Sequence, residues 1–291
     1  MKTSYVAMET QTLTPAQFAD FQTVITGALG IKMPATKQVM LQSRLHRRLR
    51  ELGMATFEEY HGRFFGDPEQ QAAELEHLLN LATTNKTDFF REPDHFDVLA
   101  KKVLPEWLGT PTGPEFAVWC AGCATGEEAY TLAMVLEEQR RNFEFSYRIR
   151  ATDVSTRVLE TARRAIYADD HIEPVPLELR RRYLLRSRDH EEHLVRIAPG
   201  LRERVRFGHL NFLSADYGMR EVFDVVFFRN VMIYFDRETQ CEVVGRICRQ
   251  LRVGGRLFIA HSETVQGMDL PLRMLGPSEY LRLPDRREVA P

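Results

Sequence analysis

The segment FAVWCAGCATGEEAYTLA, residues 116–133, constrains the fold of this chain more than any other. Its apolar run predicts a buried strand, followed by a loop with Gly122 and Gly126 and by a helix that begins with Glu127 and Glu128. About one βαβ unit later, and such a unit takes roughly 30 or more residues, the strand YRIRATD ends on Asp153. Parallel strands bring their carboxyl ends to one edge of a sheet, so these residues are expected to meet there.

This edge has the parts of a site for a cofactor that contains a nucleoside. The glycines let the backbone approach a ligand, and Asp153 can accept hydrogen bonds from a ribose diol. The loop contains neither G-x-G-x-x-G nor G-K-[ST], so it is neither a standard dinucleotide fingerprint nor a P-loop. Glu128 would repel a pyrophosphate and attract an amine. S-adenosylmethionine is a nucleoside joined to an amino acid. Its ribose could therefore contact Asp153 and its amine Glu128.

Composition narrows the class of protein. The 291 residues allow one large or two small domains, and a net charge of −2 gives no general attraction to nucleic acid or to an anionic membrane. No apolar stretch approaches the roughly 18 residues that span a bilayer, and the first residues lack the apolar core of a secretion signal. Four cysteines in a chain of this size are no disulfide framework. We therefore expect a cytoplasmic protein that does not insert into the membrane.

The order of the patterns predicts two domains of different class. Residues 1–84 form a string of short helical patterns, including one capped by Thr36 that runs to Leu52, and a linker occupies about 82–95. Residues 85–291 alternate strands and helices, which predicts an α/β domain with a mostly parallel sheet. The alternation breaks at about 169–203, where a small β-subdomain is expected to be inserted. The predicted strands are Phe116–Cys120, Tyr147–Thr152, Val205–Gly208, Phe223–Phe228, Arg256–Ala260 and Tyr280–Leu283, and the helices between them are Glu127–Arg140, Thr156–Ala165 and Arg237–Leu251.

Four strings together carry a family resemblance. They are TTNKTDFFREPDHF (83–96), the loop above, ATDVSTRVLETAR (151–163) and FFRNVMIYFDRETQ (227–240), and the set resembles the chemotaxis receptor glutamate methyltransferases, the CheR family. The similarity extends from about Phe18 to about Glu263. It implies a class I S-adenosylmethionine-dependent methyltransferase, with a Rossmann-like doubly wound sheet, an N-terminal all-helical domain that docks substrate, and a small inserted β-subdomain.

The resemblance also implies roles for single residues. Glu128 would hold the methionine amino group and Asp153 the ribose, while Arg91 and Tyr234 would be the catalytic pair beside the reacting methyl group. The other cofactor-binding residues that it implies are Asn85, Thr87, Asn211, Phe212, Arg229 and Asn230, with Arg91 contacting the cofactor as well. No metal site is expected, because the C-x-x-C of Cys120 and Cys123 lacks a second pair or histidines at ligand spacing.

Two surfaces are candidates for partner binding. Lys37, Arg44 and Arg48 share one stripe of a predicted helix, with Arg47 beside them and no acid between Ile31 and Arg50. A charge run of this kind is often a solvated helix face, but the resemblance favours docking on the cytoplasmic helical domain of chemoreceptors (methyl-accepting chemotaxis proteins). In some family members the inserted subdomain binds a receptor C-terminal peptide at a sheet edge. Here the shortness of the stretch between Arg186 and Leu194 favours such binding. The lack of glycine in its sequence SRDHEEH argues against it.

The predicted activity is methylation of glutamate side chains in receptors, which gives methyl esters and S-adenosylhomocysteine. A glutamate with a pKa of about 4.3 is ionised at neutral pH, so no general base is expected. Two alternatives remain. A nucleic-acid methyltransferase would usually show an N-P-P-Y-like motif where this chain has RNVMIY. The second alternative is a sensor or scaffold that binds the cofactor but does not transfer the methyl group. The presence of Arg91, Asn230 and Tyr234 argues against this alternative.

Overall fold

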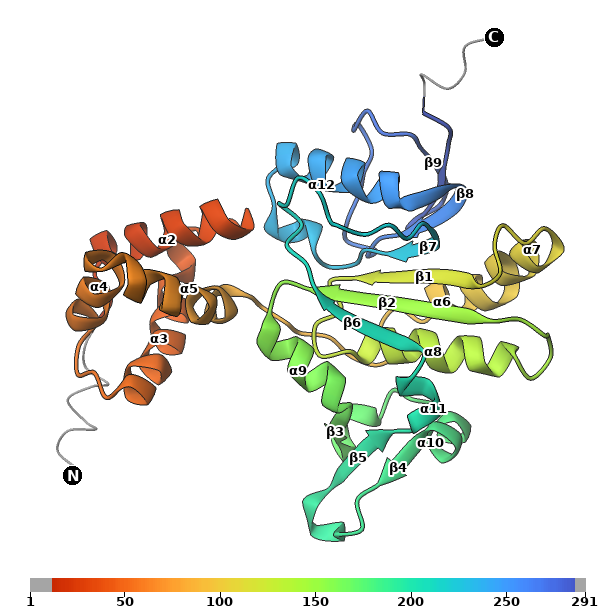
Figure 1. Cartoon of the computed structure of the whole chain (residues 1–291), viewed down its shortest axis with the longest axis horizontal. Coiled ribbons are helices and arrows are strands. Elements are labelled where there is room, and N and C mark those ends of the chain that lie inside the picture. Colours follow the sequence, from red (N-terminus) through yellow and green to blue (C-terminus); the bar gives the residue numbers. More distant parts are fainter. Residues whose placement is uncertain (1–11, 286–291) are drawn as a thin grey trace. The chain divides into compact units, whose positions relative to one another are not determined.

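The computed structural model describes residues 12–285, which divide into two compact units (Figure 1). The first takes the described residues up to Thr84 together with Tyr234–Asp236. The second takes Asn85–Ile233 and the described residues from Arg237 on. The first unit is helical and the second is α/β, so the two domain classes follow each other along the chain in the predicted order.

The helical unit owes its shape to capped helices around an aromatic core. Its helices are α2 (Pro15–Leu29), α3 (Gln38–Leu52), α4 (Phe57–Gly66) and α5 (Pro68–Ala82). Thr14 and Thr56 each form a capping box at the start of a helix, which satisfies N–H groups that have no partner inside the helix. Phe21, Tyr60 and Phe64 are fully buried and their rings contact one another.

The prediction that Thr36 caps the helix running to Leu52 was wrong. A short 3₁₀ turn, η1 (Ala35–Lys37), contains Thr36, and α3 begins after it with Lys37 in the capping position and no side-chain cap bond. The chain enters this turn from Pro34, whose extended backbone precedes η1. The helix still ends as predicted at Leu52, because Gly53 adopts the left-handed conformation there.

The α/β unit is built on a seven-stranded sheet with the order β6-β2-β1-β7-β8-β10-β9. The first five of these strands pair in parallel, and β10 pairs antiparallel to both β8 and β9. Figure 1 shows α12 (Arg237–Gln250) on one face, with α8 (Glu127–Gln139) and α9 (Thr156–Arg164) on the other. The strands are β1 (Phe116–Ala121), β2 (Tyr147–Asp153), β6 (Val205–His209), β7 (Phe223–Phe227), β8 (Leu251–Phe258), β9 (Leu272–Gly276) and β10 (Glu279–Arg282). The predicted α/β fold is confirmed.

Two strands differ from the prediction. Strand β9 was not predicted, because it is an edge strand whose side chains are half-buried or exposed and no buried apolar run marks it. Strand β8 begins at Leu251 instead of Arg256, and the glycine pair lies inside it. A Cβ on Gly255 would lie 2.8 Å from the carbonyl oxygens of both Arg252 and Asp224, so only glycine fits this close approach to β7.

The remaining elements lie before the sheet, in an insertion and after β7, where the 3₁₀ turn η5 (Met232–Tyr234) is found. Ahead of β1 come α6 (Asp94–Val98), a π turn η2 (Leu99–Val103) and α7 (Leu104–Gly109). Between α9 and β6, a second sheet has the order β3-β5-β4, formed by β3 (Ile166–Ala168), β5 (Leu194–Ile197) and β4 (Leu184–Arg186). It is accompanied by η3 (Asp169–Ile172), α10 (Leu177–Tyr183), η4 (His190–Glu192) and α11 (Pro199–Arg202). No helix within residues 12–285 is long and apolar enough to cross a membrane.

Candidate cofactor and catalytic site

The loop between β1 and α8 is held against the carboxyl end of β2. The backbone N–H groups of Gly122 and Cys123 both donate to Thr152 O, at 2.8 and 2.9 Å. Gly122 has a φ of +90°, and a Cβ there would lie 2.4 Å from the Val231 side chain. Gly126, with a φ of +100°, occupies the capping position of α8. These two positions require glycine, which agrees with a loop whose backbone approaches a ligand.

Asp153 ends β2 with its carboxylate buried under this loop. Its Oδ2 accepts from Ala124 N and its Oδ1 from Ser155 N, both at 2.9 Å. Burial raises the pKa of Asp153, and these backbone bonds oppose the rise. A carboxylate has about four lone-pair positions, so the group retains capacity to accept from a ribose diol.

Glu128 lies in the first turn of α8 between a cation and a thiol. Its Oε2 is 3.2 Å from Arg229 Nε, and its Oε1 accepts from Cys120 Sγ at 3.2 Å. Burial raises the pKa of the Cys120 and Cys123 thiols well above the ordinary value, so both are uncharged at neutral pH. A carboxylate held in this way at the start of a helix suits an ammonium group.

Arg229, just after β7, is the centre of a buried polar network. Its side chain is 1% exposed, and its Nη2 donates to the carbonyl oxygen of Arg91 at 2.5 Å. Its Nη1 is 3.2 Å from His95 Nδ1, and its Nη2 lies 3.7 Å from the carboxylate of Glu92. The structure therefore places Arg229 against Glu128 and the backbone of Arg91. Glu92 and His95 were not predicted as site residues, although both lie in the string that carried the resemblance.

Asn230 follows Arg229 in the left-handed conformation, with a φ of 59°. Its N–H donates to Glu263 Oε2 at 3.0 Å, and the same oxygen accepts from Ala260 N at 3.0 Å. Burial raises the pKa of Glu263. Glu263 thus holds the turn after β7 to the segment after β8. This role of Glu263 was not predicted. The sequence feature that could have indicated it is the position of an acidic residue shortly after the end of a predicted strand.

The other cofactor candidates lie on two segments of the α/β unit. Asn211 and Phe212 follow β6, where Asn211 Oδ1 accepts from Leu213 N at 2.9 Å and Phe212 is buried beside Trp119. Asn85 and Thr87 are half-buried in the segment before α6. Their contacts with cofactor stay predictions.

The two residues predicted to be catalytic belong to different units. Arg91 is half-buried in the α/β unit, and its Nη1 donates to Lys86 O at 3.2 Å. Tyr234 belongs with the helical unit, where its hydroxyl donates to Thr84 O at 3.2 Å and Lys37 Nζ lies 5.5 Å from its ring centroid. Their joint action at one methyl group stays a prediction.

The basic stripe of α3 is partly engaged within the helical unit. Arg48 binds both carboxylate oxygens of Glu74, at 2.8 and 3.0 Å. Arg44 Nη1 donates to Leu81 O and to Thr83 O, each at 2.7 Å. Arg47 is exposed and Lys37 is half-buried. All four remain candidates for docking, and Arg47 is the most accessible of them.

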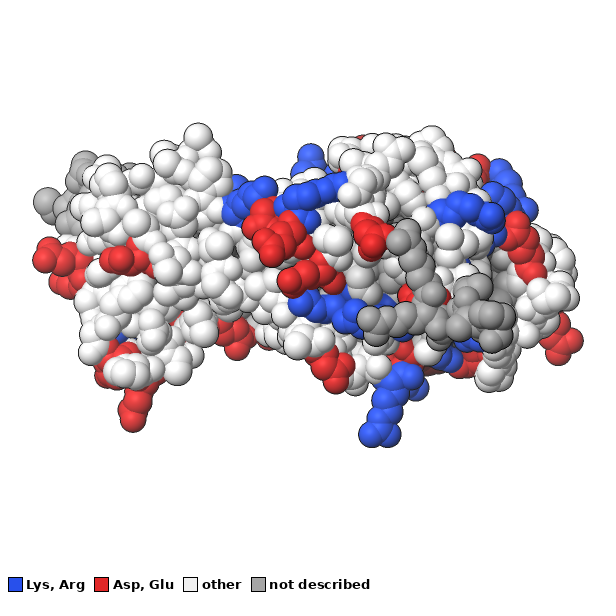
Figure 2. Space-filling model, turned by 90° about the horizontal axis from the view of Figure 1, so that it is seen from above, with Lys and Arg blue, Asp and Glu red and all other residues white. Residues whose placement is uncertain are grey.

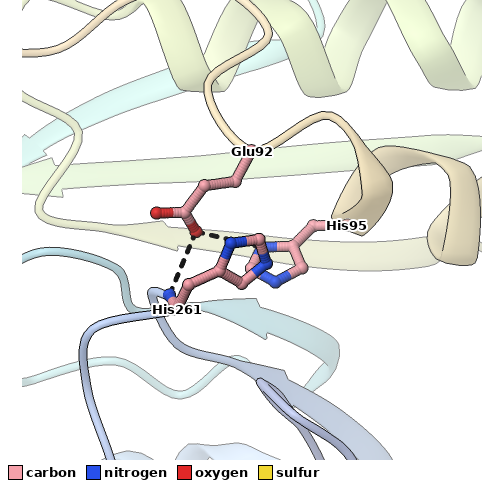
Figure 3. A group of neighbouring side chains, drawn as sticks. All are labelled: Glu92, His95 and His261. Atoms are coloured by element: carbon pink, nitrogen blue, oxygen red, sulfur yellow. Dashed lines mark hydrogen bonds and ion pairs between the residues drawn. The ribbon is translucent and has the colours of Figure 1, made fainter.

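One cluster could be taken for a metal site. Glu92, His95 and His261 offer ligand atoms within 4.8 Å of one another, and Figure 3 shows the two imidazole rings beside the carboxylate. The Arg229 guanidinium already lies 3.2 Å from His95 Nδ1, and His261 Nε2 is 3.0 Å from Asp94. A bound cation would have to face this guanidinium, so the arrangement fits a hydrogen-bonded network better. The expected absence of a metal stays a prediction.

Comparisons with known proteins cover both units. One family model, described as the CheR methyltransferase SAM binding domain, matches residues 85–281, and another, the CheR methyltransferase all-alpha domain, matches residues 16–83. A chemotaxis protein methyltransferase of Klebsiella aerogenes is 36% identical, over 92% of this chain and 90% of that protein. One of Escherichia coli (strain K12) is 35% identical, over 92% of this chain and 91% of that protein.

A chemotaxis protein methyltransferase of Borreliella burgdorferi is 35% identical, over 88% of this chain and 90% of that protein. Among solved structures, an rRNA methylase from Streptococcus thermophilus is 16% identical with a TM-score of 0.36, over 69% of this chain and 100% of that one. A likeness of that size carries no argument about function.

Proposed function

This chain belongs to the CheR methyltransferase family, and we propose that its methyl acceptors are glutamate carboxylates on the cytoplasmic helices of chemoreceptors. It is a methyltransferase of chemotaxis with S-adenosylmethionine as its cofactor. Such an acceptor places the enzyme in the cytoplasm. The observation that supports the acceptor is the similarity to chemotaxis protein methyltransferases over about nine tenths of the chain, and the pair of acids, Asp153 and Glu128, beside the glycine loop supports the cofactor.

The residues of this edge fit the cofactor on chemical grounds. Gly122 leaves no room for a Cβ, Asp153 is a buried acceptor suited to a ribose, and Glu128 is an anion suited to an amine. We assign Asn211 and Phe212 to the adenine, with Asn85, Thr87 and Asn230 completing the site. When bound, S-adenosylmethionine would supply an electrophilic methyl group for a glutamate oxygen, with S-adenosylhomocysteine as the other product.

The remaining task of the protein is to place the acceptor and to exclude water. A glutamate is already ionised at neutral pH, so the protein needs no base to activate it. We propose that the Arg91 guanidinium holds one carboxylate oxygen of the acceptor. Arginine has five N–H donors and one Nη1 bond to Lys86 O leaves others available, which supports this role. Tyr234 would form a wall of the acceptor pocket.

We propose that the basic face of α3 docks the receptor. Lys37, Arg44, Arg47 and Arg48 would meet acidic receptor helices, and charge complementarity of this kind raises the rate of encounter. The internal bonds of Arg44 and Arg48 order this face, and they leave Arg47 to make most of the contact.

The inserted sheet offers a second contact with the receptor. Its strand β4 lies at an edge, and Leu185 on this strand is 52% exposed. We propose that a receptor C-terminal peptide adds as a further strand at an edge of this sheet. Calorimetry with such a pentapeptide tests this, and the absence of a binding signal at millimolar peptide would contradict it.

The main experiment is transfer of a tritiated methyl group from S-adenosylmethionine. The acceptors are a receptor cytoplasmic fragment, the same fragment with its candidate glutamates changed to glutamine, and total RNA. Base-labile label on the first fragment alone supports the proposal. Label on RNA would support a nucleic-acid methyltransferase. The net charge of −2 argues against that activity, and on the face drawn in Figure 2 acidic and basic side chains are interspersed. Cofactor binding without transfer would support a sensor.

A further inference from the structure

The backbone around Arg91 is strained on both sides. Phe90 has a φ of 53° and Glu92 a φ of 54°, and both are outside the conformations that side chains with a Cβ prefer. Each such residue costs on the order of 1 kcal/mol or more and persists only where tertiary contacts hold it. Contacts with residues outside this short segment must therefore stabilise its backbone conformation.

The contacts that hold the segment come from three distant elements. Phe90 N donates to Thr131 Oγ1 of α8 at 3.2 Å, and Arg229 donates to the carbonyl oxygen of Arg91. The third element is the segment after β8, where His261 N donates to Glu92 Oε2 at 3.3 Å. Figure 3 shows His261 reaching Glu92 in this way.

His261 also holds the start of α6. Its Nε2 lies 3.0 Å from Asp94 Oδ2, and its ring contacts that of His95 with centroids 4.8 Å apart. Because the His261 side chain is 48% exposed, its replacement should have little effect on the free energy of unfolding. Glu92, Asp94 and His261 together form what we call the clasp.

We infer that the clasp is a positioning device for Arg91, with His261 as the member that contacts both acids. Arg229 anchors the Arg91 carbonyl from the buried side, and His261 holds Glu92 and Asp94, which follow Arg91 in the chain. The inference rests on the role of Arg91 in the proposed function. A small shift of a guanidinium that orients an acceptor lowers the rate of transfer and leaves substrate affinity nearly unchanged.

The test compares His261→Ala, which removes the link to Asp94 and leaves the backbone N–H of residue 261 to Glu92 in place, with His261→Gln, which keeps an N–H donor for Asp94. The matched control is Asp97→Ala, which removes an exposed ion pair with Lys101 on the same segment, 2.8 Å long. We expect His261→Ala to lower kcat about tenfold, with KM for the receptor and Kd for S-adenosylhomocysteine changed less than about twofold. His261→Gln should recover most of the rate, and Asp97→Ala should have no effect on it.

Amide hydrogen exchange of residues 88–92 provides a readout that needs no activity. Exchange there should be faster in His261→Ala than in wild type or Asp97→Ala. Unchanged exchange, or a wild-type kcat in His261→Ala while Arg91→Ala is inactive, would overturn the clasp. A wild-type protein that methylates no receptor fragment would instead overturn the proposed function, and an active Arg91→Ala would overturn the role of Arg91.

Discussion

Each unit of the molecule contains an arginine that is largely withdrawn from solvent and lies among acids, and the two arginines differ in how many partners they share. In the helical unit, Arg48 binds both oxygens of Glu74, and the Tyr60 hydroxyl donates to the same carboxylate at 3.4 Å. Burial by itself would raise the pKa of Glu74, but the bonds and charge of Arg48 outweigh it and the pKa is lowered. This network is complete without any ligand.

The network of the α/β unit is divided among more partners. Arg229 shares its guanidinium between Glu128, Glu92, His95 and the carbonyl of Arg91. It lies beside two strained residues, Phe90 and Glu92, and at the sheet edge that we assign to cofactor. An arginine that pairs with both oxygens of one acid serves stability. An arginine that is shared among several partners beside strained backbone is typical of a functional site.

The largest expected effect is that of Arg229→Ala. It leaves Glu128 and Glu92 without their cation, so we expect a loss of roughly 3–5 kcal/mol in the free energy of unfolding, measured in urea. Binding of S-adenosylhomocysteine should fall below detection in calorimetry, because Glu128 and the Arg91 segment lose their shared anchor. Wild-type affinity in this variant would mean that the network of Arg229 is as purely structural as that of Arg48.

Arg48→Ala should separate stability from binding. Removing one partner of a buried ion pair leaves Glu74 uncompensated, and we expect a loss of about 3 kcal/mol in the same urea experiment. Affinity for S-adenosylhomocysteine should stay at the wild-type value. A weakened affinity would show that the network of Arg48 also serves the cofactor site.

The pH dependence of stability should distinguish the two networks further. Burial, followed by the charge of Arg229, lowers the pKa of His95 from 6.5 to about 4. The folded protein thus takes up this proton at lower pH than the unfolded chain, so the contribution is full above pH 6.5 and is lost as the pH falls toward 4. Between pH 7 and pH 5 the loss should be about 2 kcal/mol. His95→Asn should flatten this slope, and an equally steep slope in the variant would exclude His95 as its source.

The smallest effect on stability is expected from Arg47→Glu. Arg47 is exposed and its pairing with Glu51 is long at 3.9 Å, so the free energy of unfolding should change by less than about 0.5 kcal/mol. KM for the receptor fragment should rise about threefold to tenfold at low salt and approach the wild-type value at high salt. Arg206→Glu, an equal charge change on an exposed residue of β6, is the control. Equal KM changes in both variants would contradict docking by α3.

Local patterns were sufficient to predict much of the α/β fold. The run from Phe116 to Ala121 is buried throughout, and Asp153 ends its strand at the predicted place. Such features depend on apolar runs, glycines and capping signals that lie within one segment. The edge strand β9 and the true start of β8 were missed because their signals lie in neighbouring strands.

What the sequence alone determined is the succession of a helical unit and an α/β unit, together with the glycine loop and the two acids of the sheet edge. Only the tertiary structure decided that Arg48 binds Glu74, that Arg229 anchors the backbone of Arg91, and that His261 reaches Glu92 and Asp94. The physical reason is distance along the chain. Helices, strands and turns depend on neighbouring residues, whereas the partner of a buried charge is chosen by whichever distant segment packing brings within hydrogen-bond reach.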